Sequence, residues 1–137
     1  MVVLRLALLL LFLGTVWSSQ WYPDFRVGVE TAKREGKLVL LYFYEEGCSY
    51  CKYMEDAVFI DPRVSTIMDN VFVVVPVDVD NTPPELDRRF RAVGTPTFFV
   101  YDPKRDRIIM QIFGLQESDE FFELLRSACK KSGVQRC

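Results

Sequence analysis

Cys48 and Cys51 are separated by Ser49 and Tyr50, and this C-x-x-C spacing is the feature of the sequence best suited to chemistry. A thiolate is a strong nucleophile, and two thiols this close can interconvert with a disulfide by passing two electrons to another sulfur pair. The first sulfur precedes an expected helix, whose unpaired N–H groups and positive dipole end favour the thiolate. We therefore predict Cys48 as an exposed nucleophile and Cys51 as a more buried resolving thiol.

Two further cysteines, Cys129 and Cys137, leave several alternatives open. A bridge that fastens the tail and a pair of free thiols are equally compatible with the sequence, and electron relay to the first pair is a third option. Four cysteines could also bind zinc, but the distant pair would have to reach the first, so we expect no metal. A purely structural Cys48–Cys51 bridge is disfavoured because so short a loop constrains the unfolded chain little.

Composition limits the class of protein. The 137 residues, half of them apolar and 26% charged, fit one domain with a hydrophobic core. The net charge of -2 gives no electrostatic reason to expect nucleic-acid binding. The chain contains no histidine, which excludes His-assisted hydrolysis and His-bearing metal sites, and Lys52 stands where c-type haem attachment requires histidine.

Residues 1–18 have the pattern of a secretory signal peptide. Arg5 precedes the apolar run 6–16, and the small residues that follow suit cleavage after Ser18. Eleven residues make about 16 Å of helix, roughly half the hydrocarbon thickness of a bilayer. A buried core helix or an uncleaved anchor is the alternative. We therefore predict a periplasmic or secreted domain at residues 19–137, in a compartment where disulfides persist.

The strands and helices that must position the cysteines are interspersed along the chain. The run before the cysteines is continuously apolar, which is typical of a strand buried on both faces. Pro76 cannot donate to a sheet ladder, so its strand either lies at an edge or ends there, and the last two strands are separated by a turn that indicates a hairpin. The connections predict an α/β fold, with a mixed four-stranded sheet and helices on both faces. The expected strands are Leu38–Tyr44, Val71–Val77, Thr97–Tyr101 and Arg107–Phe113.

Capping residues and apolar spacing predict five helices between and around these strands. In the last one, an apolar stripe of Phe122, Leu125 and Cys129 is expected to face the core. Gly36 and Gly133 are expected to end the first and last helices. The expected starts are Asp24, Cys48 (with a helical stretch through about residue 59), Asp61, Thr82 and Ser118.

The sequence resembles the thioredoxin superfamily over nearly all of residues 19–137. The strand, the cysteine motif and a Gly-Thr-Pro-Thr segment about 45 residues later occur in the family's order and on its expected elements. The matching segments are Leu38–Tyr44, Cys48–Lys52, Val77–Pro83, Gly94–Thr97 and the closing helix. The resemblance implies the thioredoxin fold.

The Gly-Thr-Pro-Thr segment is similar to the family's cis-proline loop. The resemblance therefore implies a cis Thr95–Pro96 bond facing the cysteine pair, where the Thr95 backbone and Pro96 shape a groove for an extended protein substrate. Tyr50, between the cysteines, should be exposed and is a further candidate for substrate contact, with simple solvent exposure as the alternative.

The sequence departs from the family at the positions of its proton relay. The buried acid and companion lysine of thioredoxins correspond here to Tyr42 and Pro76. Glu45 and Glu46 are the nearest candidates to accept a proton from Cys51, although their charge also opposes formation of the neighbouring thiolate. The alternative is that both belong to a solvated turn.

The resemblance implies a secreted or periplasmic thiol:disulfide oxidoreductase, similar to the small exported thioredoxin-like proteins of the SoxW-like group. No separable cofactor is expected, because the dithiol itself carries the electrons. The expected partners are protein disulfides and a membrane or periplasmic electron donor. A monomeric reductase is predicted, since so short a domain lacks the insertions of related oxidants and isomerases. The alternative is a thioredoxin-fold binding or chaperone module with a purely structural disulfide.

Overall fold

A mixed sheet of four strands forms the centre of the computed structural model, which describes residues 21–134 and residue 137. The strand order is β2-β1-β3-β4, with β1 parallel to β2 and antiparallel to β3, and with β3 and β4 joined as a hairpin. The predicted mixed sheet is therefore confirmed. The strands are β1 (Leu38–Tyr44), β2 (Phe72–Asp78), β3 (Thr97–Asp102) and β4 (Arg107–Phe113).

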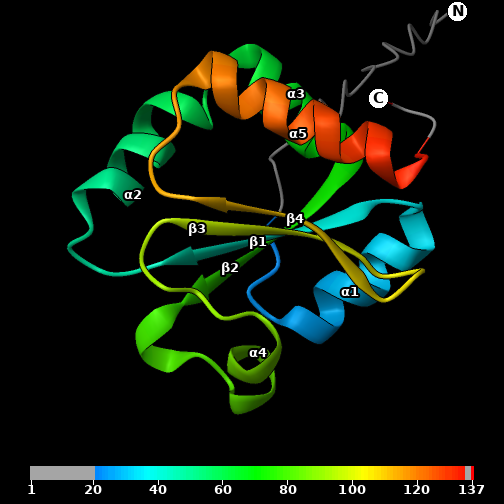
Figure 1. Cartoon of the computed structure of the whole chain (residues 1–137), viewed down its shortest axis with the longest axis horizontal. Helices are drawn as coiled ribbons and strands as arrows, with labels where there is room; N and C mark the ends of the chain where they lie inside the picture. Colours follow the sequence, from blue (N-terminus) through cyan, green and yellow to red (C-terminus); the bar gives the residue numbers. More distant parts are fainter. Residues whose placement is uncertain (1–20, 135–136) are drawn as a thin grey trace, which may run out of the picture.

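Helices cover both faces of this sheet, as predicted (Figure 1). In the view shown, α2, α3 and α5 lie on one side, and α1 and α4 lie on the other. A π-helical turn at Met54–Val58 continues α2, and a 3-10 turn at Val79–Asn81 precedes α4. The bounds of the helices are α1 (Phe25–Glu35), α2 (Ser49–Tyr53), α3 (Pro62–Val71), α4 (Pro84–Arg89) and α5 (Ser118–Ser132).

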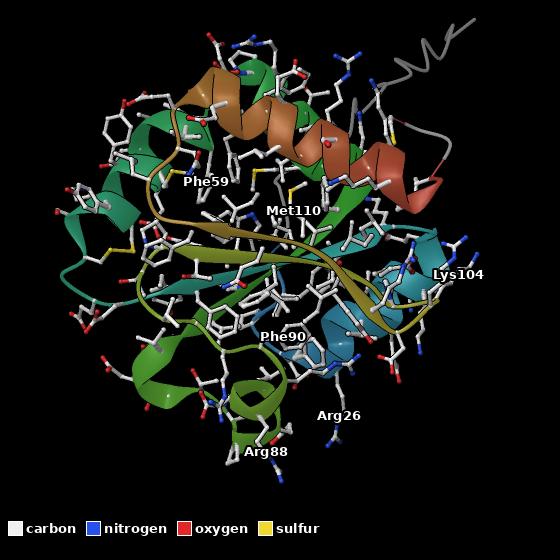
Figure 2. All side chains as sticks on the ribbon, in the orientation of Figure 1. Arg26, Phe59, Arg88, Phe90, Lys104 and Met110 are labelled. Atoms are coloured by element: carbon white, nitrogen blue, oxygen red, sulfur yellow. A yellow bond between two sulfur atoms is a disulfide. The ribbon has the colours of Figure 1, made fainter. Side chains whose placement is uncertain are left out.

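β1 is the central support of the molecule. Its side chains alternate between two hydrophobic clusters, with Leu40 and Tyr42 facing the α5 side and Leu41 and Phe43 facing the α1 side. All four are at most 1% exposed. Figure 2 shows Phe59 on the α5 side of the sheet and Phe90 on the α4 side, one in each cluster.

β2 forms an edge of the sheet, which confirms the prediction made from Pro76. This residue pairs in register with Tyr42 of β1, so its missing N–H faces away from the ladder without breaking it. On one face of β2, α1 approaches closely at Gly28. A Cβ atom there would lie 2.5 Å from Cγ2 of Val75, so any larger residue would push the helix off the sheet.

Four of the predicted helix ends are confirmed by their hydrogen bonds or geometry. The carboxylates of Asp24 and Asp61 accept bonds from the first-turn backbone of α1 and α3. Gly36 and Gly133 terminate α1 and α5. These caps fix where the chain enters and leaves the two layers of helices.

Two predicted caps are wrong. Pro83 occupies the cap position of α4, and the hydroxyl of Thr82 donates instead to the carbonyl of Asp78 in the preceding turn. Ser118 is the first residue of α5, after Glu117 at the cap position, and no side chain caps this helix. α4 thus begins one residue later, and α5 one residue earlier, than the candidate caps would require.

The predicted apolar stripe of α5 is buried at Leu125 and Cys129, whereas Phe122 packs against the same cluster only half-buried. Phe121 is fully buried between the helix and the sheet, with its ring tilted against that of Phe98, whereas Phe122 is only half-buried beside Arg63. The two phenylalanines are adjacent, so a small difference in helix phase decides which one enters the core.

Replacing Phe121 by Ala should lower the free energy of unfolding by about 3–5 kcal/mol, because it leaves a cavity in the core. The Phe122→Ala variant is the matched control and should cost about 1 kcal/mol or less. Urea unfolding followed by circular dichroism measures both. Equal losses for the two variants would contradict the burial described here.

Candidate active site

The Cys48–Cys51 disulfide lies where the chain leaves β1 and enters α2. The Cα atoms are 5.2 Å apart. Cys51 is 3% exposed and packs in the core cluster, as predicted. Cys48 is half-buried rather than fully exposed. The first sulfur is therefore the more accessible of the two.

The start of α2 places a backbone hydrogen-bond donor next to the Cys48 sulfur. Cys48 is the N-cap residue of α2, and its Sγ accepts a bond of 3.1 Å from the backbone N–H of Cys51. A capping sulfur gains more from this bond, and from the helix dipole, when it carries a negative charge. This geometry lowers the cost of a thiolate at Cys48.

The loop between β1 and α2 turns sharply at Gly47. Its φ is +81°, in the left-handed region that other residues adopt only with strain. No atom lies within 4 Å of a Cβ built there, so the constraint is conformational and not steric. The turn brings Glu45 and Glu46 to the side of the cysteine pair.

The Gly94–Thr97 segment forms a second loop beside the disulfide. The Thr95–Pro96 peptide bond is cis. The carbonyl of Pro96 accepts a 2.8 Å bond from the N–H of Gly114, and the Thr97 hydroxyl donates to the carbonyl of Gly94 at 2.6 Å. Bonds from β3 and from the end of β4 thus hold this proline loop in place.

A hollow of about 340 Å³ joins the two loops in front of the disulfide. Thr95 donates a long hydrogen bond of 3.5 Å to the Glu45 carboxylate across it, and Tyr50 is 60% exposed at its border. Pro96 is buried and does not line the hollow. We call this space the cysteine hollow; its lining consists of Glu45, Glu46, Gly47, Cys48, Ser49, Tyr50 and Thr95.

A tyrosine that shares the core cluster of Cys51 holds an exposed glutamate. Tyr42 is 1% exposed, belongs to the same core cluster as Cys51, and donates a 3.1 Å hydrogen bond to Oε1 of Glu55. Burial, followed by the negative charge of Glu55, raises the pKa of Tyr42 above its ordinary value. The tyrosine therefore remains a protonated donor that fixes the carboxylate.

Sequence reasoning missed Glu55. The available signal was its spacing, because residues four apart on a helix are neighbours and Glu55 follows Cys51 by four. The predicted relay residues Glu45 and Glu46 are exposed, as is Glu55, and Glu45 is directed to Thr95 on the Cys48 side. Their relay role stays a prediction.

Cys129 and Cys137 form a second disulfide. Cys129 is fully buried on α5, and the end of this helix lies on the opposite side of the molecule from α2 (Figure 1). The four sulfurs thus form two separate bridges and not one tetrahedral site. Within the described part of the chain, no cluster of three potential metal ligands occurs, and no helix is long and apolar enough to span a membrane.

Comparison with known proteins identifies the family. The sequence model of the thioredoxin-like family matches residues 20–103. The chain belongs to the thioredoxin-like family. The solution structure of a thioredoxin from Thermus thermophilus has a TM-score of 0.75 and 40% identity, over 85% of this chain and 92% of that one.

Two thiol:disulfide interchange proteins extend this family relationship. The protein DsbD of Ralstonia nicotianae is 30% identical over 102 residues, which are 73% of this chain but only 17% of that protein. The reduced C-terminal domain of Neisseria meningitidis DsbD has a TM-score of 0.61 and 25% identity, over 75% of this chain and 92% of that domain. The thioredoxin-like chain thus matches about one sixth of the length of the whole relative.

The two disulfides should differ strongly in their response to reductant. Reducing Cys129–Cys137 leaves a thiol in a fully buried apolar position, where its thiolate is a poor leaving group. Stepwise addition of dithiothreitol, with alkylation and mass spectrometry at each step, should show Cys48 and Cys51 labelled first. Labelling of all four cysteines in parallel would contradict this assignment.

Proposed function

We propose that this protein is a thiol:disulfide oxidoreductase that reduces disulfides in other proteins. The observation that carries the proposal is the Cys48 sulfur at the start of α2, which accepts the Cys51 N–H and opens onto the cysteine hollow. Membership in the thioredoxin-like family, and similarity to proteins named for thiol:disulfide interchange, support a redox enzyme in general.

The proposed cycle begins with the reduced pair. The Cys48 thiolate attacks one sulfur of a substrate disulfide, which forms a mixed disulfide and releases the other substrate sulfur as a thiolate. Cys51 then loses its proton and attacks Cys48, which closes the Cys48–Cys51 bond and releases the second substrate sulfur. Two electrons pass to the substrate, and a dithiol partner must return two electrons before the next cycle.

The second step requires a proton acceptor near a buried thiol. Glu55 is suited to this role because it lies one helical turn beyond Cys51 and its carboxylate is held by Tyr42. Tyr42 takes the sheet position at which the resemblance places a buried acid, so the acid is supplied from the helix instead. In the proposed cycle, Glu55 removes the Cys51 proton during resolution.

The proposed setting is the periplasm or the cell exterior. It rests on the pattern of residues 1–18, which lie outside the described residues, and on the two disulfides of the chain. A membrane or periplasmic donor that restores the dithiol, a monomeric state and the narrower SoxW-like assignment belong to the same proposal. No cofactor is needed in this scheme.

Replacing Cys48 by Ser should abolish reduction of insulin in the presence of dithiothreitol, because no thiolate remains to attack. Cys51→Ser should instead accumulate a mixed disulfide with the substrate that appears on non-reducing gels. The Cys129→Ser/Cys137→Ser double variant is the control and should retain activity. Full activity of Cys48→Ser would reject the proposed function and favour a binding module with a structural disulfide.

Replacing Glu55 by Gln should slow resolution of the mixed disulfide by about a hundredfold, the lower end of typical general-base contributions. Single-turnover mixing of the reduced protein with a disulfide peptide separates this step from the initial attack. Asp56→Asn removes a neighbouring exposed carboxylate and serves as the control. A resolution rate that is the same in both variants would exclude Glu55 as the acceptor.

A further inference from the structure

The surface around Cys48 has an apolar side next to the proline loop. Val93 is 78% exposed immediately before Gly94, and Phe113 is 58% exposed at the end of β4. The Phe113 ring lies 3.0 Å from the Cβ position on Gly94, so the ring packs directly on the loop. Val93 and Phe113 therefore expose large apolar side chains to solvent beside the segment that carries Thr95.

The opposite side of the same surface is negatively charged. Glu45 and Glu46 are exposed and line the cysteine hollow, and no lysine or arginine is among the described residues that line it. Lys52, which follows Cys51, does not line the hollow and forms a 2.7 Å ion pair with Asp56. An exposed aromatic ring, that of Tyr50, lies at the border.

We propose that this surface selects protein disulfides in extended segments that carry Lys or Arg beside the cysteine. The cation would lie against Glu45 and Glu46 with the Tyr50 ring available for a cation–π contact, and an apolar neighbour would lie against Val93 and Phe113. This inference rests on the proposed function and adds the class of substrate to it.

A basic segment would also assist the first chemical step. The two glutamates oppose the negative charge of the Cys48 thiolate, and a bound cation offsets that repulsion when the substrate disulfide arrives. The reaction is the one described above: the thiolate forms a bond to one substrate sulfur while the substrate S–S bond breaks. Charge complementarity thus affects the rate of attack as well as binding.

Two disulfide-bridged peptides of equal length test the inference. Both carry the same apolar residue, and they differ only in Lys or Glu at the positions that flank the cysteine. Single-turnover mixing with the reduced full chain should give attack that is roughly fivefold faster on the Lys peptide at low ionic strength, as expected for two partly exposed ion pairs. The ratio should fall towards one as salt is raised to about 1 M.

In a Glu45→Gln/Glu46→Gln variant, the rates of the initial attack on the Lys and Glu peptides should become equal. The matched control is Glu30→Gln/Glu35→Gln, which removes the same charge from α1 and should keep the preference. Replacing the apolar residue of the peptide by Ser should slow attack by wild-type protein but not by Phe113→Ala.

The possible outcomes are distinct. Equal rates for the Lys and Glu peptides, or an undiminished preference in the Glu45→Gln/Glu46→Gln variant, would overturn the proposed selectivity and leave the proposed function standing. Failure of the wild-type protein to reduce either peptide, or insulin, would overturn the proposed function itself.

Discussion

The hydrogen bond from the Cys51 N–H to the Cys48 sulfur is the interaction on which the site depends. It exists only because Cys48 is placed at the cap position of α2, where the first N–H groups of the helix have no carbonyl partners. The same turn of helix buries Cys51 in the core. One local geometry therefore gives two chemically similar side chains different environments.

The sheet supplies the rigidity that this geometry needs. β1 is buried on both faces and hydrogen-bonded to strands on both sides, so its end is a fixed starting point for the turn at Gly47 and for α2. The proline loop is held independently, by the bond between Gly114 and Pro96. The cysteine hollow lies between two loops whose anchors are parts of a single sheet.

Much of this arrangement could be predicted from the sequence because its strongest signals are local. The apolar run Leu38–Tyr44 defines the central strand, and Pro76 defines the edge. The cap assigned to Thr82 was wrong, and the core position of Phe121 was not predicted, because each depends on a shift of about one residue that tertiary packing decides. Glu55 was not singled out because its contact is with Tyr42, a residue distant in the sequence on β1.

The second disulfide gives the C-terminal end of the chain a covalent link that does not involve Cys48 or Cys51. Cys129–Cys137 ties the last turn of α5 to the residues beyond it, on the side of the molecule away from the reactive pair. Opening and closing of Cys48–Cys51 thus takes place in a framework with its own covalent fastening. If the first bridge opens during the proposed cycle, the second one still joins Cys137 to the last turn of α5.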